Sequence, residues 1–229
     1  MLAIASSPPA TRARDRLLDA AIELFARHGF QAIGLRDLAS HLGLHAGSLY
    51  HHIENKQCLL FELIESALSD LLLDTKRRMR GAKTPRERLR RFVQAFVAFN
   101  RREKQRLVLV TREFVNLDEE HQRQANQLKD AYRALLRTII ADEYKDRGHH
   151  EQEVGLITHA VMGLLYGQSL WIEVDISEQQ LADLFTHCVT GMIAGGTAGL
   201  TPPARPPKRT HRADRGPSGL TDTSDIPGH

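Results

Sequence analysis

Residues 35–52 combine small side chains with hydrogen-bond donors at a spacing that suits contact with phosphate groups. The first half is predicted to be a short helix, Gly43 permits a turn, and Leu44 is expected to fill the angle between two helices. A second helix begins with small residues and continues with donors, in the order Ala46, Gly47, Ser48, Tyr50, His51 and His52. Small residues let a helix N-terminus approach a phosphate backbone, which the donors can then bind. The segment therefore predicts a helix-turn-helix that contacts nucleic acid.

Other kinds of chemistry receive little support from the sequence. It has no GxSxG, no GxGxxG after a strand, no P-loop and no HExxH, so we expect no enzyme, no catalytic residue and no cofactor. His51 and His52 would point about 100° apart on a helix, without a third ligand nearby, so no metal site is expected. Cys58 and Cys188 lack CxxC spacing and are interpreted as reduced thiols.

A second feature is a strongly basic block over residues 74–112, which holds 14 Lys and Arg against three Asp and Glu, a net charge of +11. Its cations are Lys76, Arg77, Arg78, Arg80, Lys83, Arg86, Arg88, Arg90, Arg91, Arg101, Arg102, Lys104, Arg106 and Arg112. One interpretation is a solvated face. The other is that some of them bind an anionic head group, such as the phosphates of an acyl-coenzyme A. In that case aromatic residues would cover the acyl end: Phe96, Phe114, Tyr132 and Trp171.

The elements that position these residues are predicted to be helices throughout. The chain has 229 residues, is 41% hydrophobic and only 6% aromatic, and its long Ala/Leu/Arg/Glu-rich stretches lack β-branched alternation. Helix starts are marked most clearly where Thr84 with Glu87, and Ser177 with Gln180, form capping boxes. An uninterrupted helical period over Lys56–Met79 predicts a long connecting helix. The fold class is therefore all-α, with about nine helices.

We expect the chain to be divided into four segments, two of which contain a short helix. The segments are a disordered N-terminus over residues 1–10, the helix-turn-helix domain over 11–56, a ligand-binding and dimerisation domain over 57–194, and a disordered tail over 195–229. The short helices are predicted over residues 46–53 and 107–115.

No window approaches the roughly 18 to 20 apolar residues of a membrane span, and no secretory signal begins the chain. We therefore expect no membrane partner and a cytoplasmic location.

The helix predicted over Val154–Trp171 is apolar around most of its circumference, which indicates burial on more than one side. Gly163 and Gly167 stand four residues apart on one face, where they would allow another helix to approach closely. Two interpretations remain open, a subunit interface and packing within one chain.

The string Leu-Gly-Leu-His-Ala-Gly-Ser-Leu-Tyr-His-His-Ile-Glu-Asn-Lys, residues 42–56, resembles the DNA-binding signature of the TetR family of bacterial repressors. The resemblance is specific over about residues 14–60 and rests on length and helix count over residues 61–194. It implies a three-helix helix-turn-helix domain followed by a six-helix ligand-binding and dimerisation domain.

The same resemblance implies roles for individual residues. Phosphate contacts would come from Arg36, Ser48, Tyr50, His52 and Lys56, and the residues nearest the base edges would be His45, Gly47 and His51. Two positions depart from the family pattern. Gly34 stands where a hydroxyl residue usually caps the second helix and touches phosphate, and Ile53 replaces a phenylalanine beneath the recognition helix. One phosphate contact is therefore expected to be missing.

The resemblance also implies a homodimer in which the last two helices of each subunit form a four-helix bundle. We assign the interface to residues 154–171 and 181–193, with Gly163, Gly167, Leu181 and Phe185 as its contacts.

The expected function is that of a ligand-responsive transcriptional repressor. It would be released from a palindromic double-stranded DNA operator by a small apolar or anionic effector such as an acyl-CoA. Two alternatives remain open, a DNA-organising protein without a ligand and an activator.

Overall fold

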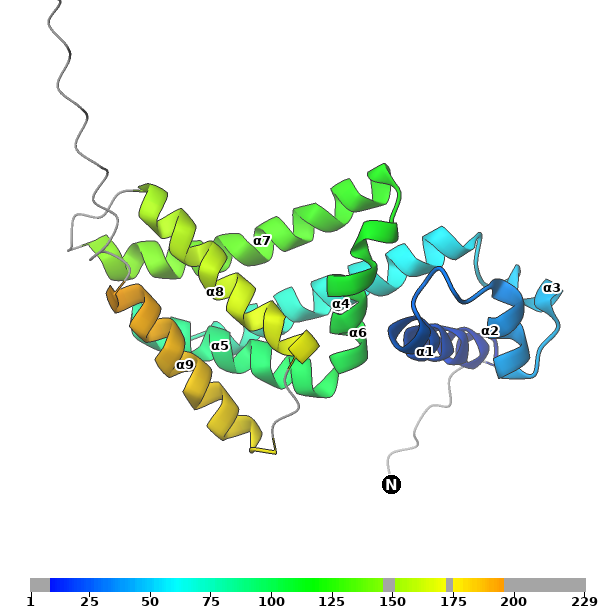
Figure 1. Cartoon of the computed structure of the whole chain (residues 1–229), viewed down its shortest axis with the longest axis horizontal. Helices are drawn as coiled ribbons and strands as arrows, with labels where there is room; N and C mark the ends of the chain where they lie inside the picture. Colours follow the sequence, from blue (N-terminus) through cyan, green and yellow to red (C-terminus); the bar gives the residue numbers. More distant parts are fainter. Residues whose placement is uncertain (1–8, 146–150, 172–174, 196–229) are drawn as a thin grey trace, which may run out of the picture. The chain divides into compact units, whose positions relative to one another are not determined.

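The structure is a computed structural model that describes the backbone of residues 9–145, 151–171 and 175–195, and the side chains of 13–145, 151–167 and 175–195. Over these ranges the chain forms nine α-helices and no strand (Figure 1), which confirms the all-α prediction. The elements are α1 (Pro9–His28), α2 (Leu35–Leu42), α3 (Ala46–Leu49), α4 (Lys56–Met79), α5 (Pro85–Arg102), α6 (Lys104–Val108), the π-helix η1 (Leu109–Glu113), the 3-10 turn η2 (Phe114–Asn116), α7 (Glu119–Tyr144), α8 (Glu151–Trp171) and α9 (Glu178–Gly195). The predicted disordered ends, 1–10 and 195–229, lie outside the described residues except for 9, 10 and 195.

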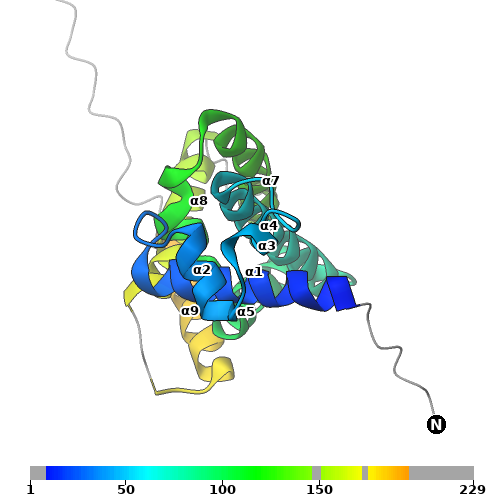
Figure 2. The ribbon, with the colours of Figure 1, turned by 90° about the vertical axis from the view of Figure 1, so that its right-hand side faces the viewer.

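The first hydrophobic core joins α1, α2 and α3 to the beginning of α4, and Figure 2 shows α2 beside α1. Its largest fully buried side chains include Leu17, Phe25, Leu38, Leu49, Leu60 and Ile64. Leu49 is the buried anchor of α3, and burying a leucine stabilises a fold by about 1.5–3 kcal/mol. A Leu49→Ala change would therefore detach α3 from the helices that support it.

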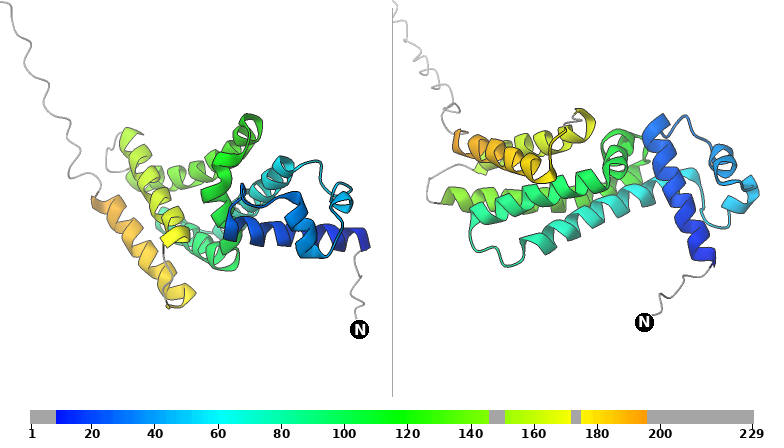
Figure 3. Two further views of the ribbon diagram at one scale, coloured as in Figure 1. Left: turned by 45° about the vertical axis from the view of Figure 1, so that its right-hand side comes forward. Right: turned by 90° about the horizontal axis from the view of Figure 1, so that it is seen from below.

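The second hydrophobic core lies among α5, α7, α8, α9 and the end of α4. It includes Phe92, Phe96, Tyr132, Leu136, Val161 and Phe185, all of which are buried. α5 packs along α4 on one side and along α9 on the other, as the two views in Figure 3 show. The predicted long helix over Lys56–Met79 is confirmed as α4, which contributes to both cores.

The helix caps follow the sequence closely. Thr84 Oγ1 accepts a hydrogen bond of 3.1 Å from the Glu87 N–H, and the Glu87 carboxylate accepts one of 3.1 Å from Lys83 N–H rather than from the cap residue itself. Ser177 and Gln180 form the complete reciprocal pair, at 2.9 and 3.1 Å. Such caps satisfy backbone N–H groups that have no partner inside the helix.

Two predicted helices differ from the structure. The helix expected over residues 107–115 is interrupted by η1 and η2. Within this stretch the Thr111 hydroxyl donates to the Leu107 and Val108 carbonyl oxygens, at 2.9 and 3.1 Å. The helix expected over 46–53 ends at Leu49. The next residues form a turn in which the His52 N–H donates to Leu49 O at 2.8 Å.

Candidate nucleic-acid interface

In the turn between α2 and α3, the residue that ends α2 has a left-handed backbone conformation, which glycine adopts most easily. Gly43 has φ +67°, and Leu44 N–H donates back to Ala39 O at 2.8 Å. Leu44 itself is 38% exposed, so the prediction that it fills the angle between the helices is wrong. Leu38 and Leu49, both fully buried, fill that angle because the turn directs Leu44 outward.

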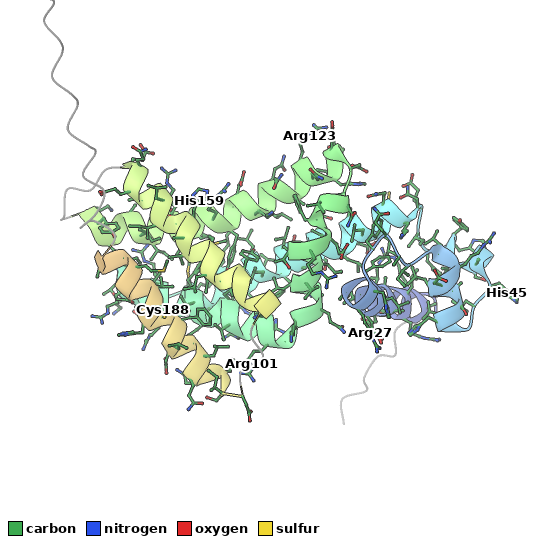
Figure 4. The ribbon with its side chains drawn as sticks, viewed as in Figure 1. Arg27, His45, Arg101, Arg123, His159 and Cys188 are labelled. Atoms are coloured by element: carbon green, nitrogen blue, oxygen red, sulfur yellow. The ribbon has the colours of Figure 1, made fainter. Side chains whose placement is uncertain are left out.

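The predicted DNA-contacting residues lie together on α2, on α3 and in the turn that follows. Arg36, His45, Gly47, Tyr50 and His51 are exposed, Tyr50 by 61%, while Ser48 and His52 are half-buried. Figure 4 shows His45 projecting away from the ribbon at the start of α3. None of these side chains has a hydrogen-bond or ion-pair partner among the described residues. Their donors are therefore available to a ligand from outside the chain.

Lys56, the remaining predicted contact, is placed differently. Its Nζ lies 4.1 Å from the centroid of the Phe30 ring and 5.9 Å from that of Phe25, a cation–π arrangement. Partial burial lowers the pKa of Lys56, and the nearby charge of Asp37 opposes that shift. Lys56 thus packs against the end of α1 as well as standing at the start of α4.

The structure shows how the chain accommodates the two residues that depart from the family pattern, Gly34 and Ile53. Gly34 caps α2 without a side-chain hydrogen bond, and its N–H instead donates to Asp37 Oδ2 at 2.7 Å. Ile53 is buried in the first core, where its side chain supports α3 from below.

Much of the basic block is occupied in holding helices together. Arg88 binds Asp142 on α7 at 2.8 Å, Arg102 binds Asp74 on α4 at 2.9 Å, and Arg106 binds Asp70 on α4 at 2.8 Å. Six cations of the block, all around the α4–α5 connection, make no side-chain hydrogen bond or ion pair in the part of the chain that the structure describes, although Arg78 and Arg90 lower the pKa values of Asp74 and Glu87 through their charge: Lys76, Arg78, Arg80, Lys83, Arg86 and Arg90. Arg86 and Arg90 line a groove of about 470 Å³ between α5 and α9.

The predicted ligand-covering aromatics do not form one wall. Phe96 and Tyr132 are buried in the second core, with Phe96 5.1 Å from the ring of Tyr166, whereas Phe114 packs against the first core beneath Lys129 Nζ. The side chain of Trp171 lies outside the described residues. None of the pockets described between the ordered helices is lined by Phe96, Phe114 or Tyr132.

Two buried polar atoms, one on α5 and one on α8, were not expected from the sequence. Tyr166 Oη and Asn100 Oδ1 are buried without a hydrogen-bond partner among the described residues. Burial also raises the pKa of the Tyr166 phenol. Buried polar groups usually have partners, so these two atoms are candidates to bind a polar group of a ligand. Both lie within helices whose apolar period gave no signal for a polar position.

The predicted interface residues fall into two groups. Gly163 is exposed and Gly167 half-buried, and a Cβ added at either would meet nothing within 4 Å. Leu181 and Phe185 are instead buried in the second core of their own chain, because α9 turns that face toward α5. The exposed faces of α8 and α9 carry apolar and small residues, namely Leu156 (51% exposed), Ala160, Gly163, Leu184 (53% exposed), Cys188 and Gly191. We call these six residues the α8–α9 face, and Cys188 on it is labelled in Figure 4.

The described residues include neither a cluster of metal ligands nor a membrane-spanning helix. No group of three or more His, Cys, Asp or Glu side chains is placed there to hold a metal ion. None of the helices described is long and apolar enough to cross a membrane.

Two family sequence models match the chain. The model described as bacterial regulatory proteins of the tetR family matches residues 17–63, which include the whole helix-turn-helix. The model described as the tetracyclin repressor-like C-terminal domain matches residues 82–193. The chain belongs to the TetR family. Proteins of the TetR family are in general DNA-binding regulators rather than enzymes.

Individual TetR proteins are similar over different lengths. The transcriptional repressor KstR2 of Mycolicibacterium smegmatis is 36% identical over 100 residues, which cover 43% of this chain and 48% of that protein. Matches to the first curated relatives span between 28 and 56% of their length. A tetR-family regulatory protein from Rhodococcus RHA1 has the same fold, with a TM-score of 0.74, 21% identity and coverage of 80% of this chain and 97% of that one.

A further solved structure with the same fold is of a complex. It is that of AibR in complex with isovaleryl coenzyme A and operator DNA, with a TM-score of 0.68 and 19% identity, covering 76% of this chain and 96% of that chain. At this level of identity the likeness shows the fold alone.

Proposed function

We propose that this protein is a ligand-responsive transcriptional regulator that represses from a palindromic operator and is released by a small molecule. The observation that carries the proposal is the cluster of exposed, unpartnered donors on α2, α3 and the following turn, within the part that the tetR-family model matches. The proposal assigns no catalytic role, and it places the protein in the cytoplasm with the bacterial chromosome.

In this proposal α3 enters the major groove. Arg36, Ser48, Tyr50, His52 and Lys56 bind phosphates, which fix the position of the helix on the duplex. His45, Gly47 and His51 lie nearest the base edges and set the sequence preference. Because each neutralised phosphate releases counterions, affinity should fall steeply as the salt concentration rises.

We further propose that two copies associate through the α8–α9 face. Its exposed apolar and small side chains are of the kind that two helices of a partner can cover. A two-fold dimer would present two copies of α3 to half-sites about one helical turn of DNA, or a multiple of it, apart. This arrangement replaces Leu181 and Phe185, which are buried in their own chain, with Leu184 and Cys188 as contacts.

The proposed effector is a small apolar or anionic molecule, and an acyl-CoA ester is the first candidate. The unpartnered cations around the α4–α5 connection suit its phosphates, and the AibR structure named above holds a coenzyme A ester. Binding in the second domain would move α4 and change the separation of the two α3 helices. A hundredfold release from DNA requires the effector to prefer the released conformation by about 3 kcal/mol.

The test begins with duplexes that the protein enriches from a random-sequence library, followed by gel retardation. The Tyr50→Ala, His51→Ala double variant should lose at least about tenfold in affinity, because it removes one phosphate and one base contact. Arg123→Ala, at an exposed position of α7 labelled in Figure 4, is the matched control and should bind as the parent does. If the double variant retards the duplex as strongly as the parent, the assigned surface is wrong.

The effector is tested on the same protein–duplex complex. Short-chain, long-chain and aromatic acyl-CoA esters are titrated in, and at least one should release the duplex. If none does, the acyl-CoA proposal is wrong, and uniform binding to many unrelated duplexes would favour the DNA-organising alternative.

A further inference from the structure

Glu113 is the one carboxylate among the buried residues that the structure describes, at 5% exposure. It is the last residue of η1. Its Oε2 accepts hydrogen bonds from the Phe30 backbone N–H at 3.2 Å and from Asn116 Nδ2 at 2.8 Å. Burying a carboxylate is costly unless it is hydrogen-bonded, so these bonds are necessary for its position.

The residue that Glu113 binds lies at the entry to the DNA-contacting segment. Phe30 follows Gly29, whose φ of +90° ends α1, and its N–H therefore has no partner within a helix. The Glu113 carboxylate supplies that partner from the other domain. Arg112 adds a longer contact to the same helix end, with its Nη1 3.4 Å from Ala26 O.

Asn116, at the end of η2, extends the contact to both flanks of the DNA-contacting segment. Its Oδ1 accepts from Gln31 Nε2 at 2.9 Å, on the stretch that leads into α2. Its backbone oxygen accepts from Gln57 Nε2 at 2.9 Å, on the first turn of α4, just after that segment. Residues 35–52 are thus held at both ends by one four-residue stretch, residues 113–116.

The partners belong to different parts of the chain. Glu113 and Asn116 lie within the stretch matched by the C-terminal family model, and Phe30, Gln31 and Gln57 within the stretch matched by the DNA-binding model. The stretch begins in a π-helix, a form that occurs mostly as single turns and frequently at functional sites.

We infer that Glu113, together with Asn116, is a positioning residue for DNA binding: it clamps both flanks of residues 35–52 to the effector domain and so fixes the orientation of α3. The inference rests on the proposed function, because it concerns the same DNA-contacting surface. Glu113 touches no DNA in this account. It acts by holding Phe30 and, through Asn116, Gln31 and Gln57, and displacement of η1 by an effector would release all three.

The experiment compares Glu113→Met and Glu113→Gln with the parent. Met fills the same space but accepts no hydrogen bond, whereas Gln keeps one acceptor oxygen. We expect Glu113→Met to lose about tenfold in affinity for the selected duplex, equivalent to about 1.4 kcal/mol, and Glu113→Gln to lose less. Amide hydrogen exchange at Phe30 and Gln31, measured without DNA, should be faster in Glu113→Met. Glu120→Gln is the matched control, since Glu120 binds only Arg123 and Gln124 of its own helix among the described residues.

Each result decides the inference. Faster exchange at Phe30 with unchanged DNA affinity would overturn it, as would unchanged exchange at Phe30 in Glu113→Met. Should Glu113→Met fail to fold, the pair Gln31→Ala and Gln57→Ala, both at half-buried or exposed positions, removes the two Asn116 contacts and should lower affinity in the same way. A parent protein that binds no duplex at all would instead contradict the proposed function, while the exchange measurement would still report on the clamp.

Discussion

Lys56 combines two physical roles that the sequence could not separate. The family signature ends at this residue and implies a phosphate contact, yet its Nζ lies over the Phe30 ring at the end of α1. Partial burial there lowers its pKa, which is the expected effect of removing an ammonium group from water. The contact with the Phe30 ring helps to hold the helix-turn-helix together before any DNA is bound, and the desolvation of the Lys56 ammonium group opposes it.

Replacing Lys56 by methionine tests this packing role. Lys56→Met keeps most of the aliphatic volume and removes the charge, so the free energy of unfolding should fall by about 0.5–1 kcal/mol, the usual value of a cation–π contact. Urea unfolding followed by circular dichroism measures it. Lys76→Met, at an exposed lysine without a partner among the described residues, is the control and should leave the unfolding free energy unchanged. Equal effects in both variants would contradict the packing role.

Asp74 is expected to make the free energy of unfolding depend on pH in the acidic range. Its hydrogen bond with Arg102, and the charge of Arg77, lower the pKa of this carboxyl below that of an unfolded aspartate, about 3.9. A carboxyl with a lowered folded pKa stabilises the protein above the unfolded pKa, and that stabilisation is lost as the pH falls through the folded pKa. Asp74→Asn should therefore lower stability by about 0.2–1 kcal/mol at pH 7 and show a shallower loss between pH 5 and 3 than the parent.

The measurement is urea unfolding at pH 7, 5, 4 and 3. Asp130→Asn provides the comparison, because Asp130 pairs with Arg133 of its own helix on an exposed surface. If Asp74→Asn and the parent lose stability in parallel as the pH falls, Asp74 does not contribute to the acid dependence.

At the scale of elements, α2 begins with a weak cap. Gly34 offers no side-chain acceptor, and a Cβ added there would lie 3.2 Å from Asp37 Oδ2, the mobile end of a side chain that can shift. A serine at this position could accept from a backbone N–H of the first turn and reach a phosphate.

Gly34→Ser should accordingly strengthen both folding and DNA binding. We expect a few tenths of a kcal/mol in the unfolding free energy, about the difference between a glycine and a serine cap. Affinity for the selected duplex should rise while the slope of affinity against salt stays the same, because no charge is added. Gly34→Ala, which adds the Cβ without the hydroxyl, controls for the change in backbone freedom. A Gly34→Ala variant that binds DNA as well as Gly34→Ser would contradict a contact by the hydroxyl.

Elements with strong local signals were predictable, and those set by distant contacts were not. The caps at Thr84 and Ser177 depend on residues three positions away, so the sequence alone locates the helix starts. The π-helix over Leu109–Glu113 ends at a buried carboxylate that binds Phe30, more than 80 residues away, and no periodic pattern marks either feature. The burial of Leu181 and Phe185 within their own chain could not be predicted either. An apolar stripe on a helix does not show whether a helix of the same chain or of a partner subunit will cover it.

At the scale of the whole molecule, the α8–α9 face should decide the oligomeric state. Gly163 has open space where a Cβ would stand, so Gly163→Glu adds a charge to this face without disturbing the chain's own core. We expect the parent to be a dimer by light scattering after gel filtration, and Gly163→Glu to be a monomer with unchanged helix content. Arg123→Glu, on α7, should remain dimeric. A dimeric Gly163→Glu variant would place the interface elsewhere.

The candidate DNA surface was predictable to a larger extent than the effector site. Most of the proposed contacts with DNA come from a short contiguous string, residues 42–56, which lies within the family-model match, so the signature holds them in order. An effector pocket is built from side chains on several helices, and the sequence does not show which helices lie next to one another. Phe96 and Phe114 were predicted to cover the same ligand, but the structure places them in different cores.

The sharing of α4 between two cores has a practical consequence for protein engineering. This helix contributes five residues to the core that it shares with α1, α2 and α3: Leu59, Leu60, Leu63, Ile64 and Leu68. A fragment that ends at Lys56 would lack these residues, and the apolar faces of α1, α2 and α3 would be exposed to water. A chimaera that transplants the proposed DNA-contacting segment onto another effector domain should therefore have its junction beyond Leu68, and should carry the matching residues of the 113–116 stretch along with it.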